Sequence, residues 1–131
     1  MIEVVSRVPI EKGWSGDRKY RVTDAKGTNY LMRVSPMEGY ARKQAQFEMI
    51  SRVAGLGVPM CRPVEFGACA EGAYAILTWI DGEDAEARIP RMTEARQYAF
   101  GLRAGEILRR IHEIPAPDGQ EPWEARMNRK I

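Results

Sequence analysis

The sequence predicts an α+β fold in which an antiparallel sheet of five strands carries one helix and is followed by a second, longer helix. Three observations predict it. Short β-branched segments are separated by glycine-containing turns, as in hairpins. One helical pattern stands between two such hairpins, and a longer one follows a polar connector. Because hairpins make antiparallel sheets, we expect the first helix to cover one face of the sheet.

The first three strands are predicted from alternation and turn residues. Residues 2–8, "IEVVSRV", form the first strand, and the polar loop "EKGWSGDR" (11–18) follows with two glycines. Residues 19–24 alternate, and residues 28–35 are again rich in β-formers. The intervening "AKG" is a turn signal, so these two strands form a hairpin.

The first helix follows residue 35. Ser35 can act as its N-cap, Pro36 suits the first helical position, and Glu38 completes a capping box. Phe47 and Ile50 recur at helical spacing. The glycines and prolines of "GLGVPMCRP" then end the helix.

The second half of the chain contains another hairpin and the longer helix. Residues 63–80 form the hairpin, with its turn near Glu71 and Gly72. Residues 81–90 are polar, and a helix is expected at about 93–114. Its apolar stripe consists of Phe100, Ala104, Ile107, Leu108 and Ile111. The remaining tail is polar, contains prolines and contributes no obvious core.

Composition excludes several classes of function. The 131 residues carry 20 basic and 18 acidic side chains, and this net charge of +2 argues against nucleic-acid or anionic-membrane partners. Three cations in the tail "RMNRK" are read as solvated. No apolar run suits a signal peptide or the roughly 18 residues of a membrane span, so a cytoplasmic protein is expected. Cys61 and Cys69 are expected to be buried free thiols.

Two polar features could bind an anion. Gly13, Ser15 and Gly16 lie in a loop between antiparallel strands, where backbone amides can turn toward a phosphate, although a plain hairpin loop is the simpler interpretation. Arg33 is a cation between Met32 and Val34 in a predicted strand. It could meet that anion, or it could be a solvated side chain on an open sheet face.

A third feature is the segment "ILTWIDGED" (76–84). An apolar strand that stops at a polar, glycine-containing connector can offer unpaired backbone groups to a planar base such as adenine. Trp79 and Ile80 could equally belong to the core.

Five ordered segments carry a family resemblance: "GWSGDRKYRV", "YLMRVS", "AGLGVPMCRPVEFG", "WIDGED" and "AGEILRRIHEI". Together they resemble the aminoglycoside phosphotransferase and choline-kinase-like family of small-molecule kinases, over approximately residues 11–114. The resemblance implies a protein-kinase-like N-terminal lobe at residues 1–80. It further implies a hinge or connector at 81–92 and the start of an incomplete C-terminal lobe at 93–131.

The resemblance also implies nucleotide-binding roles. Arg33 would hold the α- and β-phosphates of ATP in place of the family's usual lysine, and Leu31 would lie against the adenine. The helix glutamate that orients this cation would be Glu48, with Gln46 as the alternative, in which case the ion pair is lost. The loop over the phosphates would comprise Ser15, Gly16, Asp17 and Arg18, and the hinge groups would come from Thr78 and Ile80.

The family's catalytic residues have no counterpart here. Phosphoryl transfer needs an aspartate that accepts the hydroxyl proton, and an Asn and an Asp that hold Mg²⁺. In the family these belong to an "H-G-D-x-x-x-x-N" stretch and a later Asp motif, and neither occurs here. The only histidine, His112, is followed by Glu-Ile near the end of a structural helix. No catalytic or metal-binding residue is therefore assigned.

The resemblance leaves two functions open. The chain is expected to be the ATP-binding part of a small-molecule phosphotransferase that is inactive alone, or else a non-catalytic binding module with the shape of a kinase lobe. The apolar stripe at 93–114 needs a partner, which would be a second copy, another polypeptide or the rest of a C-terminal lobe. The acceptor cannot be inferred.

Overall fold

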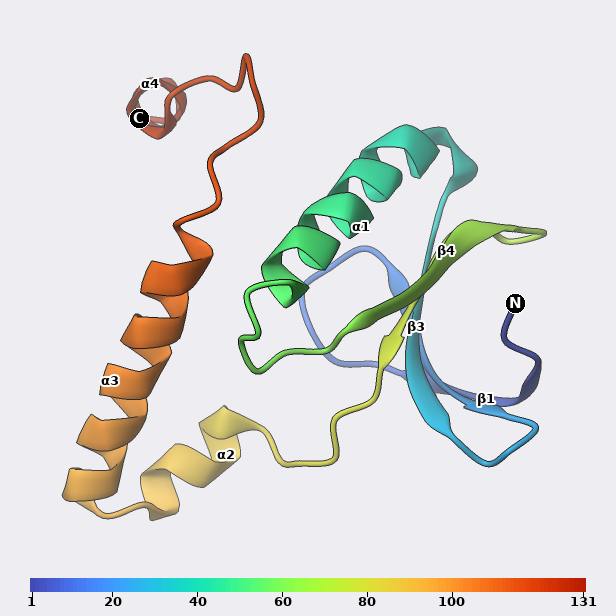
Figure 1. Ribbon diagram of the computed structural model, residues 1–131, viewed down its shortest axis with the longest axis horizontal. Coiled ribbons are helices and arrows are strands. Elements are labelled where there is room, and N and C mark those ends of the chain that lie inside the picture. Colours follow the sequence, from blue (N-terminus) through green and yellow to red (C-terminus); the bar gives the residue numbers. More distant parts are fainter.

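A single antiparallel sheet of five strands forms the first part of the molecule (Figure 1). The strand order is β1-β2-β3-β5-β4. The computed structural model describes residues 1–131. The predicted α+β class and five-stranded antiparallel sheet are confirmed. The strands are β1 (Val4–Ile10), β2 (Arg18–Asp24), β3 (Asn29–Ser35), β4 (Pro63–Cys69) and β5 (Gly72–Thr78).

Helix α1 (Tyr40–Ala54) connects β3 to β4 and packs against β4 and β5. Its aromatic contacts explain the position. The ring centroids of Tyr40 and Phe66 lie 5.1 Å apart, and those of Phe47 and Phe66 lie 5.5 Å apart. The predicted apolar face of the first helix therefore covers the sheet through one aromatic group on β4.

The predicted capping box at the start of this helix is wrong. Ser35 is the last residue of β3, pairs with Ala73 and is buried. A short 3₁₀ turn, Met37–Gly39, precedes α1. The N-cap residue of α1 is Gly39, so no side chain caps the first turn of this helix. Strand pairing takes Ser35 into the sheet, because a ladder position satisfies its backbone groups as well as a helix would.

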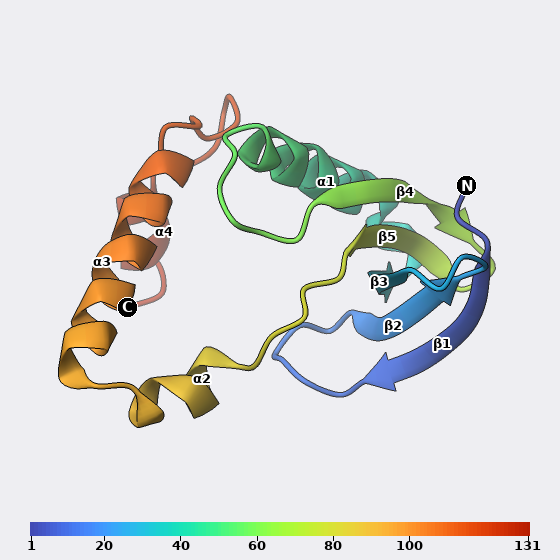
Figure 2. The ribbon, with the colours of Figure 1, turned by 60° about the horizontal axis from the view of Figure 1, so that its bottom comes forward.

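The sheet curls so that its two edges approach each other (Figure 2). The backbone amide of Ile2 donates to Glu65 on β4 over 3.2 Å, although β1 and β4 are opposite edges. In the turn between β4 and β5, the Glu71 carboxylate pairs with Arg7 of β1 at 2.6 Å and with Arg18 of β2 at 3.3 Å. Side chains thus bridge strands that do not neighbour each other in the sheet.

The buried core belongs mainly to the sheet. Only 8 of 131 residues are buried, and none of them lies in a helix. The buried apolar residues are Val22, Val34, Val58, Ala73, Ile76 and Leu77. Central strands β3 and β5 supply four of these six, which makes them the stable framework on which any site must be built.

A connector and three helical segments follow the sheet. Helix α2 (Ala85–Arg88) leads through the 3₁₀ turn Ile89–Arg91 to α3 (Glu94–Ile111), which lies to one side of the sheet (Figure 1). Thr93 caps α3 by accepting a hydrogen bond from the Arg96 amide. The tail also contains a short helix that the sequence did not predict, α4 (Trp123–Asn128).

Two smaller expectations can be compared with the structure. Both cysteines are free, as expected, but neither is buried, since Cys61 is partly exposed and Cys69 is exposed. None of the helices combines the length and the apolar character that crossing a membrane requires.

Candidate functional site

A cleft of about 1050 Å³ lies between the β1–β2 loop and the segment that follows β5. Leu31, Thr78 and Ile80 line it, together with Trp79 and Lys19. The structure thus gathers three of the predicted site residues. The volume is at the upper end of the roughly 300–1000 Å³ typical of small-molecule pockets, so the cleft can hold a ligand of nucleotide size.

The two predicted hinge residues, Thr78 at the end of β5 and Ile80 beyond it, differ in whether their backbone amides are hydrogen-bonded. The Thr78 amide donates to the Arg62 carbonyl at 2.8 Å, and the Arg62 amide donates to Thr78 Oγ1 at 2.8 Å. Thr78 is therefore already tied to the preceding loop. The amides of Trp79 and Ile80 donate to no backbone carbonyl, which leaves Ile80 as the better hinge donor.

The loop at residues 11–18, which we call the glycine loop, forms polar contacts with the connector after β5 and with β2. Lys12 pairs with Asp84 of the connector at 2.7 Å, and this hydrogen bond raises the pKa of the Lys12 ammonium. Lys19 of β2 donates a hydrogen bond to the Lys12 carbonyl. Gly13 has φ +93°, a backbone conformation that L side chains rarely adopt, so glycine is favoured at this point of the loop.

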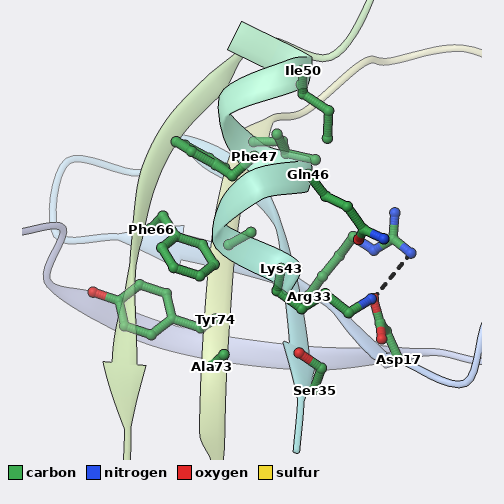
Figure 3. A pocket seen from close by; sticks show the side chains of 12 residues that line it. Asp17, Arg33, Ser35, Lys43, Gln46, Phe47, Ile50, Phe66, Ala73 and Tyr74 are labelled. Carbon is green, nitrogen blue, oxygen red and sulfur yellow. Dashed lines mark hydrogen bonds and ion pairs between the residues drawn. The ribbon is translucent and has the colours of Figure 1, made fainter. Parts of the chain in front are cut away.

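Arg33 lies beside the cleft and contacts the glycine loop directly (Figure 3). Its Nη2 donates to Ser15 Oγ at 3.0 Å and pairs with Asp17 Oδ2 at 3.1 Å. Lys43 of α1 pairs with the same Asp17 oxygen at 2.9 Å. The Asp17 side chain is only 10% exposed, so one largely buried carboxylate bridges two cations.

Leu31, Arg33 and Lys19 share one face of the sheet. Leu31 and Arg33 are two residues apart on β3, and side chains at this spacing point to the same side. Lys19 is the direct partner of Arg33 across the β2–β3 ladder. The cleft and the Arg33 cluster are therefore neighbouring parts of one surface.

The helix residue beside Arg33 is Gln46 and not Glu48. Lys43, Gln46, Phe47 and Ile50 line the cavity between α1 and the sheet, and Figure 3 shows Gln46 extending toward the guanidinium. Glu48 is exposed and forms no ion pair. The expected Arg33–Glu48 ion pair is thus absent, because Gln46, three residues after Lys43 and four before Ile50, lies on the helix face that lines this cavity, and Glu48 does not.

Of the other predicted loop residues, Gly16 lies beside the Arg33 cluster and Arg18 lies away from it. Gly16 lines a polar cavity of about 450 Å³ beside the cluster, with Ser15, Asp17 and Lys43. Arg18 is paired with Val34 in the ladder, so it projects from the face opposite Arg33. Its guanidinium contacts Glu71, as described above, and not the cluster.

Sequence reasoning does not identify Lys43, and it places Asp17 in the phosphate loop without predicting its ion pairs with Arg33 and Lys43. A signal for Lys43 was available, because it lies four residues before Phe47 and seven before Ile50, on one helix face. Asp17 belongs to an irregular loop without periodicity, so nothing in the pattern predicts where its carboxylate lies.

The chain holds no evident metal site or general base in this region. No group of three or more His, Cys, Asp or Glu side chains is arranged to bind a metal ion. His112 is the C-cap residue of α3, outside the lining of the cleft. The residues present therefore fit a nucleotide's base and phosphates but not a bound Mg²⁺, and no step is assigned to that ion.

The chain matches a protein-family model and is similar in structure to a known phosphotransferase. The model of the phosphotransferase enzyme family matches residues 6–131. The chain is similar to a crystal structure of an aminoglycoside-3'-phosphotransferase of type VIII, with 23% identity and a TM-score of 0.48. The match covers 65% of this chain and 33% of the other, so the chain spans about a third of that structure's length. No curated protein matches the sequence.

Proposed function

The chain belongs to the phosphotransferase enzyme family, and from this premise we propose that it is the nucleotide-binding portion of an ATP-dependent small-molecule phosphotransferase. The complete enzyme would move the γ-phosphate to a hydroxyl group of an acceptor. One observation carries the proposal. Arg33 is held at the glycine loop, beside a cleft large enough for a nucleoside.

The adenosine end of ATP would lie in the cleft. Leu31 offers an apolar contact from the sheet. Ile80 also lines the cleft, and its amide, which donates to no backbone carbonyl, could donate a hydrogen bond to the edge of a base. An apolar cleft with a few placed polar groups is the usual setting for such ligands.

The phosphate end would lie toward Arg33 and the glycine loop. A guanidinium presents several donors in a rigid plane and can bind two oxygens of a phosphate at once. Its Nε is buried and has no hydrogen-bond partner, so the side chain still has an unused donor. Burying a donor without a partner is costly, and a phosphate oxygen would remove that cost.

We propose that this chain binds and orients ATP but does not transfer phosphate by itself. Transfer depends on positioning both reactants and on stabilising charge in the transition state. The residues of this chain supply contacts for the nucleotide, whereas no residue is placed as a general base for an acceptor hydroxyl.

Calorimetric titration of Mg-ATP and of adenosine into the wild type and Arg33→Ala tests the proposal. We expect the substitution to weaken ATP binding by at least about tenfold, which corresponds to the loss of one charge-assisted contact, and to leave adenosine binding unchanged. Arg52→Ala is the matched control, since Arg52 is exposed on α1 and forms no ion pair. ATP binding that is indifferent to Arg33→Ala would refute the assigned site.

The second candidate is a non-catalytic binding module with the same lobe. One observation favours it: Arg33 already has an ion-pair partner in Asp17, and its helix neighbour is the uncharged Gln46. A melting temperature that no nucleotide raises, in a protein that is folded, would select this alternative.

A further inference from the structure

The charges around Asp17 do not balance. Arg33 and Lys43 both pair with Asp17 Oδ2, at 3.1 and 2.9 Å, so two cations share one carboxylate oxygen. Their side chains are 35% and 19% exposed, and water screens them only in part. The neighbouring polar cavity adds Glu38 and Arg42, which offset each other. The cluster therefore retains one uncompensated positive charge.

Arg33 is also incompletely bonded. Nε and Nη2 form one edge of the guanidinium, and an oxyanion with two oxygens can bind both. Asp17 and Ser15 engage only Nη2, while Nε is buried without an acceptor. The Asp17 carboxylate therefore occupies one of the two donors on this edge, Nη2, and leaves Nε without a partner.

The three charged groups differ in how they are held. Arg33 lies in β3 and Lys43 in α1, so regular elements position both cations. Asp17 lies in the β1–β2 loop beside Gly16, where an added Cβ would meet nothing within 4 Å. The anion can therefore be exchanged for another while both cations stay in position.

We propose that Lys43 is a second phosphate-binding cation, and that Asp17 holds the place of a phosphate oxygen until a nucleotide displaces it. This inference rests on the proposed nucleotide-binding function and specifies its phosphate site. An incoming polyphosphate takes the Nε–Nη2 edge of Arg33 and the ammonium of Lys43, and the Asp17 carboxylate turns out to solvent. The phosphate site is then built from a strand cation and a helix cation.

The inference predicts opposite changes in phosphate affinity when the charge of Lys43 or that of Asp17 is removed. Calorimetry with inorganic tripolyphosphate, Mg-ATP and adenosine compares Lys43→Met, Asp17→Asn and the control Arg52→Met. We expect Lys43→Met to weaken both phosphate ligands by about tenfold. Asp17→Asn removes the competing charge and should tighten both severalfold. Adenosine binding should change in neither variant, and Arg52→Met should behave as the wild type.

A structural ion pair would give a different pattern. If Asp17 only positions Arg33, Asp17→Asn weakens tripolyphosphate binding, and that result overturns the inference. Unchanged affinity in Lys43→Met also overturns it. Lys43→Arg keeps the cation and should retain binding, and melting without ligand confirms that each variant is folded. Failure of the wild type to bind ATP and adenosine refutes the proposed function itself, whereas ATP binding that ignores Lys43 refutes only this inference.

Discussion

Gly72 shows how a single residue determines the local backbone. Its φ is +133°, and a Cβ added there would lie 2.1 Å from the Ser35 carbonyl oxygen. Backbone cannot move aside as a flexible side chain can, because it belongs to the β3–β5 ladder. Ser35 and Gly72 therefore approach each other at the point where β3 ends and the chain turns toward α1.

We expect Gly72→Ala to lower the free energy of unfolding by more than about 2 kcal/mol, since it adds a clash to an unfavourable φ. Chemical denaturation monitored by circular dichroism measures this change. Gly101→Ala is the control, because its added Cβ meets nothing within 4 Å inside α3, and there alanine should be tolerated or stabilising. Equal stability of Gly72→Ala and the wild type would contradict the steric argument.

Alternation and helical spacing account for the site residues that sequence alone could predict. Leu31 and Arg33 alternate on one strand, so their shared face follows directly from the pattern. Charge alone favours Glu48 over Gln46 as the partner of Arg33, whereas helical spacing from Ile50 points to the face of Lys43 and Gln46. Position on the helix, rather than charge, determined which side chain lies beside Arg33.

The curled sheet is held partly by a contact between elements that are distant in its order. Glu71 in the β4–β5 turn pairs with Arg7 of β1 and Arg18 of β2. The hydrogen bond from Arg7, more than the charge of Arg18, lowers the pKa of the Glu71 carboxyl. The folded state therefore favours the ionised carboxylate.

We expect Glu71→Gln to lower the melting temperature at neutral pH by an amount that shrinks as the pH is reduced. Because the folded pKa is depressed, the contribution of Glu71 is present above its unfolded pKa and is lost as the pH falls through the folded one. Thermal melts of both proteins from neutral to acidic pH measure the difference. A gap in melting temperature that does not depend on pH would mean that packing, and not charge, explains the effect.

Element types were easier to predict than element ends. Both hairpins and the two long helices follow from period and turn residues, and their positions agree with the structure to within a few residues. The start of α1 did not follow, because the competition between strand pairing and capping at Ser35 depends on β5, which is remote in sequence. The curl of the sheet depends likewise on side chains such as Glu65 and Glu71, which no local pattern relates to β1.

The two halves of the molecule differ in how much of their surface is buried. The sheet contains nearly all of the buried residues, whereas α3 contains none and exposes large apolar side chains. The exposed apolar residues of α3 are Tyr98, Phe100, Leu102 and Leu108. The contact between α3 and the first half includes a hydrogen bond from Arg110 to the Leu56 carbonyl. Most of the stability of a helix in a protein comes from packing of its apolar face, and α3 has no buried residue to supply it.

We therefore expect the amide hydrogens of α3 to exchange with solvent far faster than those of β3 and β5 in the same molecule. Local opening of α3 breaks few tertiary contacts, while opening the central strands disrupts the core. Hydrogen exchange followed by mass spectrometry measures both regions at once, with the central strands as the internal standard. The measurement is repeated over a range of protein concentrations. If exchange in α3 is slow and becomes slower as the protein concentration rises, a second copy covers its apolar side chains. Slow exchange that does not depend on concentration would contradict the marginal stability assigned to the helix.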